Sequence, residues 1–343
     1  MDIVTITMNP AIDKSVQVNA LVPEVKLRCT HMKTEPGGGG INVSKALKRL
    51  GKDSLAIFPA GGHNGNMLQD LLREQELNFR TIPVKPETRE NFIVLETTSN
   101  NQYRFNIASP VLDEMVTGEC LALLSNLPFK PAFIVASGSL PEGIHENFYA
   151  DIAAFSKKKG ARFILDSSGT PLRLAANEGV YLLKPNLSEL AGLSGVERLS
   201  KEDAVNAAQQ VIARGHCEVI VVSLGAEGAL LVTKEFHEFI AAPAVKKTST
   251  VGAGDSMVAG MVYMLSQNES LSNMARFGVA CGSAATMNPG TELFHQQDAQ
   301  ELYSNMSRRP SYHLRILTLL KAKAISPFRL FVFLQVTCNP KNK

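Results

Sequence analysis

Residues 250–256 (TVGAGDS) combine two glycines and a carboxylate directly before an apolar helical run over residues 257–265. Glycines at a helix entry let the backbone bend so that the free N–H groups of the first turn converge, and the helix dipole adds partial positive charge there. An anion is expected at this point. Asp255 in the same turn would repel a bound phosphate, but it could accept a proton from an attacking hydroxyl. The segment therefore predicts phosphoryl transfer to an alcohol, with an ordinary Gly-rich helix start as the alternative.

A second glycine cluster, residues 36–43 (PGGGGINV), also opens a predicted helix. Glycine lets a polar ligand approach the backbone closely, and Asn42 in the first helical turn can hydrogen-bond vicinal hydroxyls. A flexible linker is the competing interpretation. A dinucleotide-binding fold is disfavoured, because no G-x-G-x-x-G follows the first strand and no acidic residue stands at the expected spacing.

Two strand ends carry further candidates. In residues 184–189 (KPNLSE), Asn186 is a natural helix cap, but Asn186 and Glu189 share a helix face and could hold Mg²⁺ through water. Residues 223–228 (SLGAEG) form either a nucleotide-shaping turn or an ordinary hairpin turn.

The composition is that of a globular enzyme. The chain has 343 residues, 45% hydrophobic and 20% charged, enough for a large α/β core. The formal net charge of +3 is small and dispersed, so we expect no nucleic-acid partner. The five cysteines are widely spaced without a CxxC motif, which favours neither disulfides nor zinc and points to the cytoplasm. We expect no signal peptide and no membrane segment.

Short apolar strands alternate with helical stretches along the chain. Strands are expected at residues 3–7, 54–59, 132–137, 162–165, 181–184 and 219–223, and helices at 41–50, 64–76, 146–159 and 201–214. This pattern predicts an α/β fold with a mostly parallel central sheet and helices on both faces. Two segments interrupt it, at about residues 13–34 and 90–107. We expect them to form a small antiparallel sheet with one wet face, a lid over the site at the strand ends.

Several segments, taken in order, carry a family resemblance. They are residues 26–30 (KLRCT), 35–43 (EPGGGGINV), 57–62 (IFPAGG), 102–105 (QYRF), 137–141 (SGSLP), 166–169 (DSSG) and 249–257 (STVGAGDSM). In them the chain resembles the ribokinase-like sugar kinases of the phosphofructokinase B family over about residues 1–308. The resemblance implies a three-layer sandwich with a β-sheet lid. Residues 309–343 match nothing in the family and are interpreted as a disordered or non-native extension.

The resemblance implies transfer of the ATP γ-phosphate to the 1-hydroxyl of fructose 6-phosphate. Asp255 would be the base, and the amides of Gly252, Ala253 and Gly254 the anion hole. Substrate contacts are implied for Asp13, Lys26, Gly38, Gly39, Asn42, Arg89, Arg104 and Ser139. ATP contacts are implied for Lys184, Asn186, Ser223, Gly225, Gly228, Lys247, Val279 and Ser283. Magnesium is implied near Asn186 and Glu189, and K⁺ near Ser249, Val251, Ala285, Asn288 and Gly290.

The same resemblance implies a homodimer joined through the lid sheets. Tagatose 6-phosphate and fructose 1-phosphate stay open as acceptors, although kinases for those sugars tend to carry Gly-Gly-Lys-Gly where this chain has four glycines. A catalytically inactive relative that binds sugar phosphate and nucleotide is a further alternative. For Arg89 and Arg104 the alternative is a solvated charge on the lid.

Overall fold

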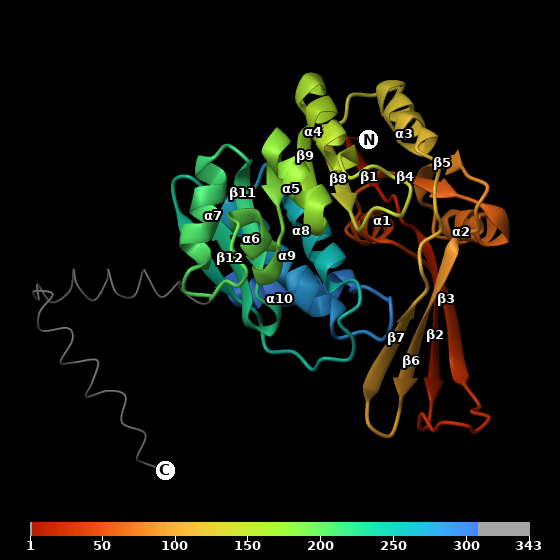
Figure 1. Cartoon of the computed structure of the whole chain (residues 1–343). Helices are drawn as coiled ribbons and strands as arrows, with labels where there is room; N and C mark the ends of the chain where they lie inside the picture. Colours follow the sequence, from red (N-terminus) through yellow and green to blue (C-terminus); the bar gives the residue numbers. More distant parts are fainter. Residues whose placement is uncertain (1, 308–343) are drawn as a thin grey trace, which may run out of the picture. The chain divides into compact units, whose positions relative to one another are not determined.

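The computed structural model describes residues 2–307 and has a nine-stranded sheet as its centre (Figure 1). All neighbours pair in parallel except β12 and β13, which form an antiparallel edge, so the predicted mostly parallel sheet is confirmed. The strand order is β13 (His237–Ala241), β12 (Gly228–Val232), β11 (Cys217–Ser223), β10 (Val180–Leu183), β9 (Arg162–Asp166), β8 (Phe133–Ser137), β1 (Ile3–Ile6), β4 (Leu55–Ala60) and β5 (Asn78–Pro83).

Helices cover both faces of this sheet, which gives the expected three layers. One layer comprises α3 (Met115–Ser125), α4 (Phe148–Lys159), α5 (Gly169–Glu178), α6 (Leu187–Ser194) and α7 (Ala204–Ala213). The other holds α1 (Gly39–Arg49), α2 (Gly62–Glu74), α8 (Ala253–Ser266) and α9 (Leu271–Ala285). A 3₁₀ turn, η1 (Gly225–Glu227), joins β11 to β12, and α10 (Gln296–Ser307) is the last described helix.

Successive side chains of each central strand pack alternately against the two helical layers. Val4 and Ile6 of β1 belong to the core under α3 to α7, and the Thr5 hydroxyl between them faces α1, where its Oγ1 lies 2.7 Å from the Ser44 Oγ. Successive strand side chains point to opposite faces, so a strand buried on both sides must be apolar nearly throughout. That is why β1, β4, β8 and β11 were recognisable as continuous apolar runs.

A separate four-stranded sheet forms the lid, in the order β3 (Thr30–Gly37), β2 (Ala11–Val18), β6 (Arg89–Glu96) and β7 (Asn101–Asn106) (Figure 1). The prediction that it is antiparallel is wrong for its central pair, because β2 and β6 run parallel. The reason is their origin: β2 continues from β1 and β6 from β5, and both leave the carboxyl-end edge of the large sheet in the same direction. The two flanking pairs are antiparallel, as expected.

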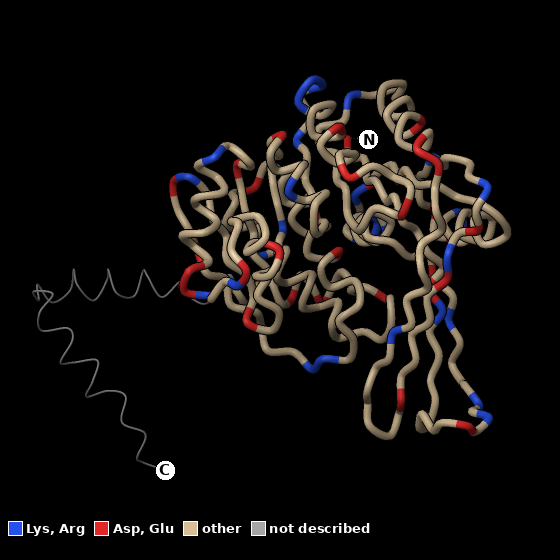
Figure 2. Tube along the Cα trace, in the orientation of Figure 1, with Lys and Arg blue, Asp and Glu red and all other residues tan. Residues whose placement is uncertain are grey.

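The described strands all lie in a compact unit that ends at Leu302, within α10. The predicted extension, residues 309–343, lies outside the described residues. In the described part, no helix is both long and apolar enough to span a membrane. Figure 2 shows Lys and Arg interspersed with Asp and Glu over the trace, which agrees with the dispersed charge of the sequence.

Candidate active site

The order of strands itself indicates where a ligand should bind. The chain builds β1, β4 and β5 towards one edge and later β8, β9, β10 and β11 towards the other, so the direction reverses between β1 and β8. In open α/β sheets, ligands bind beyond the carboxyl ends of the strands at this reversal. The segments that leave β1 and β8 there contain Asn9 and Ser139, and the Asn9 Nδ2 donates to the Ser139 Oγ over 3.1 Å.

Asp255 lies in the first turn of α8 and is held from two sides. The Asn42 Nδ2 donates to its Oδ2, and the Ser137 Oγ donates to its Oδ1, each over 3.0 Å. The pKa of Asp255 is raised from its ordinary 3.8 to about 6, chiefly by burial and then by the neighbouring charge of Asp166, which together outweigh the lowering effect of the two hydrogen bonds and Lys184. A carboxylate with a pKa near neutrality is suited to proton transfer at physiological pH.

The turn before Asp255 is the segment in which the anion cradle is predicted. Gly252 caps α8 with a φ of +70°, a left-handed conformation that costs glycine little. The amides that follow it belong to the first helical turn, which has no acceptors further back in the helix. Gly254 is exposed beside the carboxylate, and the Ala253 amide donates to the Thr250 carbonyl over 3.5 Å.

An ion pair between Lys184 and Asp166 borders this cradle, with the Lys184 Nζ 3.1 Å from the Asp166 Oδ1. A Cβ atom on Gly254 would lie 3.6 Å from the Lys184 Nζ and 3.8 Å from the Asp166 Oδ2. Burial disfavours the Lys184 charge, but Asp166, Glu189 and Asp255 outweigh this and raise its pKa. The ammonium is therefore kept charged next to the cradle. Sequence reasoning gave Asp166 no role, although it ends strand β9 inside a motif.

A second group of polar side chains, predicted to contact the acceptor sugar, is organised around Asp13. The Asn91 Nδ2 donates to the Asp13 Oδ1 over 2.8 Å, and the Arg89 Nη1 donates to the Asn91 Oδ1 over 3.1 Å. Burial raises the pKa of Asp13. Asn91 was not predicted as a site residue; its signal was its position opposite Asp13 in the register of β2 and β6. The buried Asn42 Oδ1 has no partner among the described residues and remains available to a ligand hydroxyl.

Packing gives the glycine tetrad a structural reason besides the predicted close approach of a ligand. A Cβ atom on Gly39 would lie 2.3 Å from the Ser137 Oγ, and one on Gly40 would lie 2.4 Å from the Ile6 carbonyl oxygen. These glycines let α1 begin in contact with β1 and β8, which brings Asn42 to Asp255. The tetrad is thus a rigid helix start, and the linker alternative is excluded.

Two of the predicted substrate residues lie apart from this group. Arg104 is exposed and donates through its Nη2 to the Thr250 Oγ1 over 2.6 Å, beside the cradle and away from Arg89's partners. Lys26 is exposed in the connection between β2 and β3, beyond the end of β2 that is remote from Asp13. Within one chain, the structure does not bring Lys26 together with Asp13, Asn42 and Ser139.

Several predicted ATP residues cluster at the ends of β10 and β11. Asn186 and Ser223 form a parallel bridge, and Asn186 makes a capping box with Glu189. Burial raises the pKa of Glu189, and Asp166 adds to the effect. Residues 223–228 form a hairpin turn between β11 and β12, one of the two predicted forms of this segment. Gly225 and Gly228 adopt positive φ there. The other predicted positions are exposed Lys247, buried Val279 and half-buried Ser283, the last two on α9.

The predicted monovalent-cation residues lie on two adjoining loops, except Ala285, which is the last residue of α9. The Ser249 Oγ donates to the Gly290 carbonyl over 3.1 Å, and the Ser249 amide donates to the Thr286 carbonyl over 3.2 Å. Asn288 holds the second loop through a 2.8 Å bond from its Nδ2 to the Leu293 carbonyl. Residues 2–307 hold no group of three or more His, Cys, Asp or Glu side chains placed to bind a metal directly.

The chain is similar to known proteins over most of its length. The model of the pfkB family of carbohydrate kinases matches residues 3–297. ATP-dependent 6-phosphofructokinase isozyme 2 from Escherichia coli (strain K12) is 42% identical over 311 residues, which cover 89% of this chain and 99% of that protein.

Solved structures of phosphofructokinase-2 from Escherichia coli are similar over 90% of this chain and 99% of theirs. The complex with fructose-6-phosphate has a TM-score of 0.84 at 40% identity. The complex with potassium has a TM-score of 0.85 at 41% identity. A tetrameric inhibited form has a TM-score of 0.83 at 40% identity.

Proposed function

The chain belongs to the pfkB family of carbohydrate kinases, and we propose that it transfers the terminal phosphate of ATP to the 1-hydroxyl of fructose 6-phosphate. The observation that carries the proposal is the Asp255 carboxylate at the start of α8, with a pKa raised to about 6 and both oxygens held by Asn42 and Ser137. A base beside a cradle of helix N-terminal amides is what phosphoryl transfer to a hydroxyl requires.

The residues divide the chemistry between them. Asp255 takes the proton of the 1-hydroxyl as that oxygen attacks the γ-phosphorus in line with the departing ADP. The amides of Gly252, Ala253 and Gly254 stabilise the charge that develops on the transferred group. Asp13 and Asn42 bind sugar hydroxyls, while Arg89 and Ser139 bind the 6-phosphate. Lys184 supplies positive charge on the nucleotide side, next to Gly254.

A divalent cation fits the nucleotide side. The carboxylate of Asp166 raises the pKa of both Asp255 and Glu189, and all three carboxyl groups act on the Lys184 ammonium. The nucleotide side is therefore rich in negatively charged groups. Mg²⁺ prefers oxygen ligands and keeps several waters, and Asn186 and Glu189 would hold it through them. The ion would neutralise charge on the phosphates of ATP. K⁺ would bind carbonyl oxygens of the loops that contain Ser249, Val251, Ala285, Asn288 and Gly290.

The test of the function is a coupled assay of the full chain with MgATP and each of three acceptors. We expect fructose 6-phosphate to give the highest kcat/KM, with ADP and fructose 1,6-bisphosphate formed in equal amounts. A preference for fructose 1-phosphate or tagatose 6-phosphate would reassign the acceptor. ATP and sugar-phosphate binding without turnover would identify an inactive relative.

The pH profile follows from the state of Asp255. Only the ionised carboxylate can accept the proton, and its pKa is about 6. We therefore expect kcat to fall as the pH drops through about 6, towards tenfold per pH unit, and to level off above about 7. The measurement should use saturating substrates, because a sugar phosphate itself titrates near pH 6. A flat kcat between pH 5 and 8 would contradict the assignment.

The outer face of the lid supports a homodimer. Phe92 pairs with Phe105, and Val94 with Tyr103, across β6 and β7, so these side chains share one face. Phe92 is 38% exposed and Phe105 51% exposed. A sheet this small with an exposed apolar face normally packs against a partner. The occupant that fits best is the identical face of a second copy, because a self-complementary patch closes a two-fold dimer.

Light scattering should therefore show a dimer at micromolar concentration, and Phe105→Lys should dissociate it by burying an unpaired charge at the interface. Phe239→Lys is the matched control, since Phe239 is 56% exposed on the edge strand β13 of the large sheet. A monomeric parent, or an assembly that persists in Phe105→Lys, would exclude the lid interface.

A further inference from the structure

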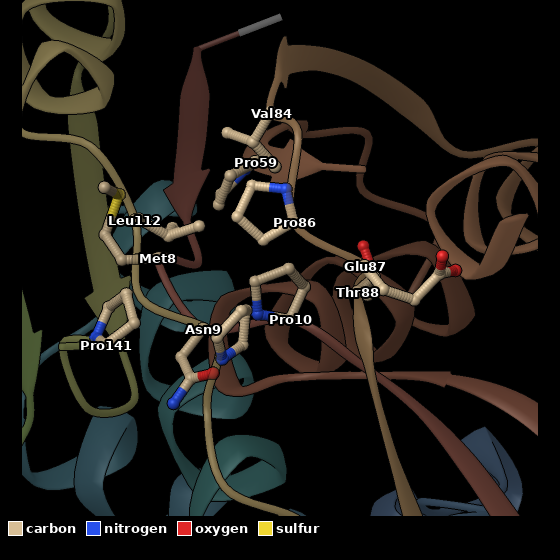
Figure 3. A pocket seen from close by; sticks show the side chains of 11 residues that line it. Met8, Asn9, Pro10, Pro59, Val84, Pro86, Glu87, Thr88, Leu112 and Pro141 are labelled. Atoms are coloured by element: carbon tan, nitrogen blue, oxygen red, sulfur yellow. The ribbon is translucent and has the colours of Figure 1, made fainter. Parts of the chain in front are cut away.

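Asn9 is a buried polar residue to which no role has been assigned, although its side chain makes two hydrogen bonds beside the site. It lies in the short connection from β1 to β2 and is 8% exposed. Its Nδ2 donates to the Ser139 Oγ over 3.1 Å and to the Ser109 Oγ over 2.6 Å, so both N–H bonds of the amide are used. Figure 3 shows Asn9 between Pro10 and Pro141, at the edge of a small pocket that these residues line.

The bond from Asn9 determines how the Ser139 hydroxyl can act. The Nδ2 group can only donate, so it occupies a lone pair of the Ser139 oxygen and leaves the hydroxyl hydrogen free for another acceptor. An anionic oxygen is the strongest acceptor for that hydrogen. Asn9 thus leaves the Ser139 hydroxyl free to donate its hydrogen to a ligand.

The backbone of Asn9 also contacts the second group of the same subsite. The Arg89 Nη2 donates to the Asn9 carbonyl over 3.4 Å, while the Arg89 Nη1 donates to the Asn91 Oδ1 and the Ile107 carbonyl. The guanidinium is therefore held from both sides. Its buried Nε has no partner among the described residues, so this N–H is available to a ligand.

We propose that Asn9 is a positioning residue that orients Ser139 and Arg89 together for the phosphate of the acceptor sugar. The inference rests on the proposed function, in which these two residues bind that phosphate. A residue behind the contacting groups adds affinity by fixing their geometry before the ligand arrives.

Asn9→Ala should raise KM for fructose 6-phosphate about tenfold, the value of one ordinary hydrogen bond, and leave kcat and KM for ATP within about twofold. Calorimetry with fructose 6-phosphate and no ATP should show the same weakening of Kd. Because it needs no turnover, this binding experiment tests Asn9 even if the coupled assay shows that the proposed activity is absent.

Two further variants separate positioning from a general loss of structure. Asn9→Asp has nearly the same shape, but the introduced carboxylate accepts the Ser139 hydrogen and repels phosphate, so its Kd should be weaker than that of Asn9→Ala. Ser109→Ala keeps the bond from Asn9 to Ser139, and we expect less than about a threefold effect. Equal rises in KM for both substrates, or an unchanged Kd in both Asn9 variants, would overturn the inference.

Discussion

Asp255→Asn should lower kcat by about 10² to 10⁴-fold, the usual contribution of a general base, with little change in KM for ATP. Asparagine preserves the shape and can keep the contacts with Asn42 and Ser137, but it cannot accept the proton of the 1-hydroxyl. Steady-state kinetics at pH 8, where the parent carboxylate is ionised, is the appropriate measurement. A variant that retains half the parental kcat would remove Asp255 from the role of base.

The stability of the same variant provides the control. Because the folded-state pKa of Asp255 is raised to about 6, its ionised form is disfavoured in the folded protein, and stability falls as the pH rises from about 4 through 6. Asparagine avoids this cost, so Asp255→Asn should not lower Tm at pH 8. A large fall in Tm would mean that the kinetic loss reports unfolding.

Arg89→Ala should raise KM for the sugar phosphate about 10 to 100-fold and KM for ATP far less. The reason is that a charge-assisted hydrogen bond contributes about 1.5–3 kcal/mol. Arg89→Lys should fall between the parent and alanine, since lysine keeps the charge but cannot donate from a planar fork. Initial rates with each substrate varied in turn measure the asymmetry.

Arg80→Ala is the matched control, because Arg80 is an exposed arginine on β5, at the edge of the large sheet. It should leave both KM values unchanged. If Arg89→Ala raised both KM values equally, Arg89 would support the lid through Asn91 and Asn9 without touching the ligand. Arg104→Ala is informative beside it: the notable contact of Arg104 is with Thr250, next to the cradle, so a fall in kcat would place its role there.

The strands buried on both faces were the most predictable part of the fold. Each predicted strand is present to within two residues at either end, because a two-sided burial demands an unbroken apolar run. Strand β12, although buried, was not predicted, and neither were the edge strands β5 and β13. Exposed and buried residues mix in them, as the sequences NFRTIP and HEFIA show, so neither follows a clear period.

The chain order of the lid segments could likewise be read from the sequence, but the direction of the central pair could not. Alternation of apolar and polar residues in β7 indicates a sheet with one exposed face, whereas β6 contains the continuous apolar run FIVL. Whether β2 and β6 run parallel depends on which edge of the large sheet each strand leaves. That is a property of the assembled topology and leaves no local pattern.

The sequence by itself was enough to predict the chemistry, since Asp255 in a Gly-rich helix start combines a candidate proton acceptor and a candidate anion cradle within one local segment. The tertiary structure alone decided which distant residues support it. Asn42 and Ser137 lie 213 and 118 positions away from Asp255, and Asn9 lies 130 positions from Ser139. Such contacts arise because parallel strands bring their carboxyl ends to one edge whatever their separation along the chain. Asn9 follows the first strand without any local sequence signature. Only the packed structure therefore reveals its contacts with Ser139 and Arg89.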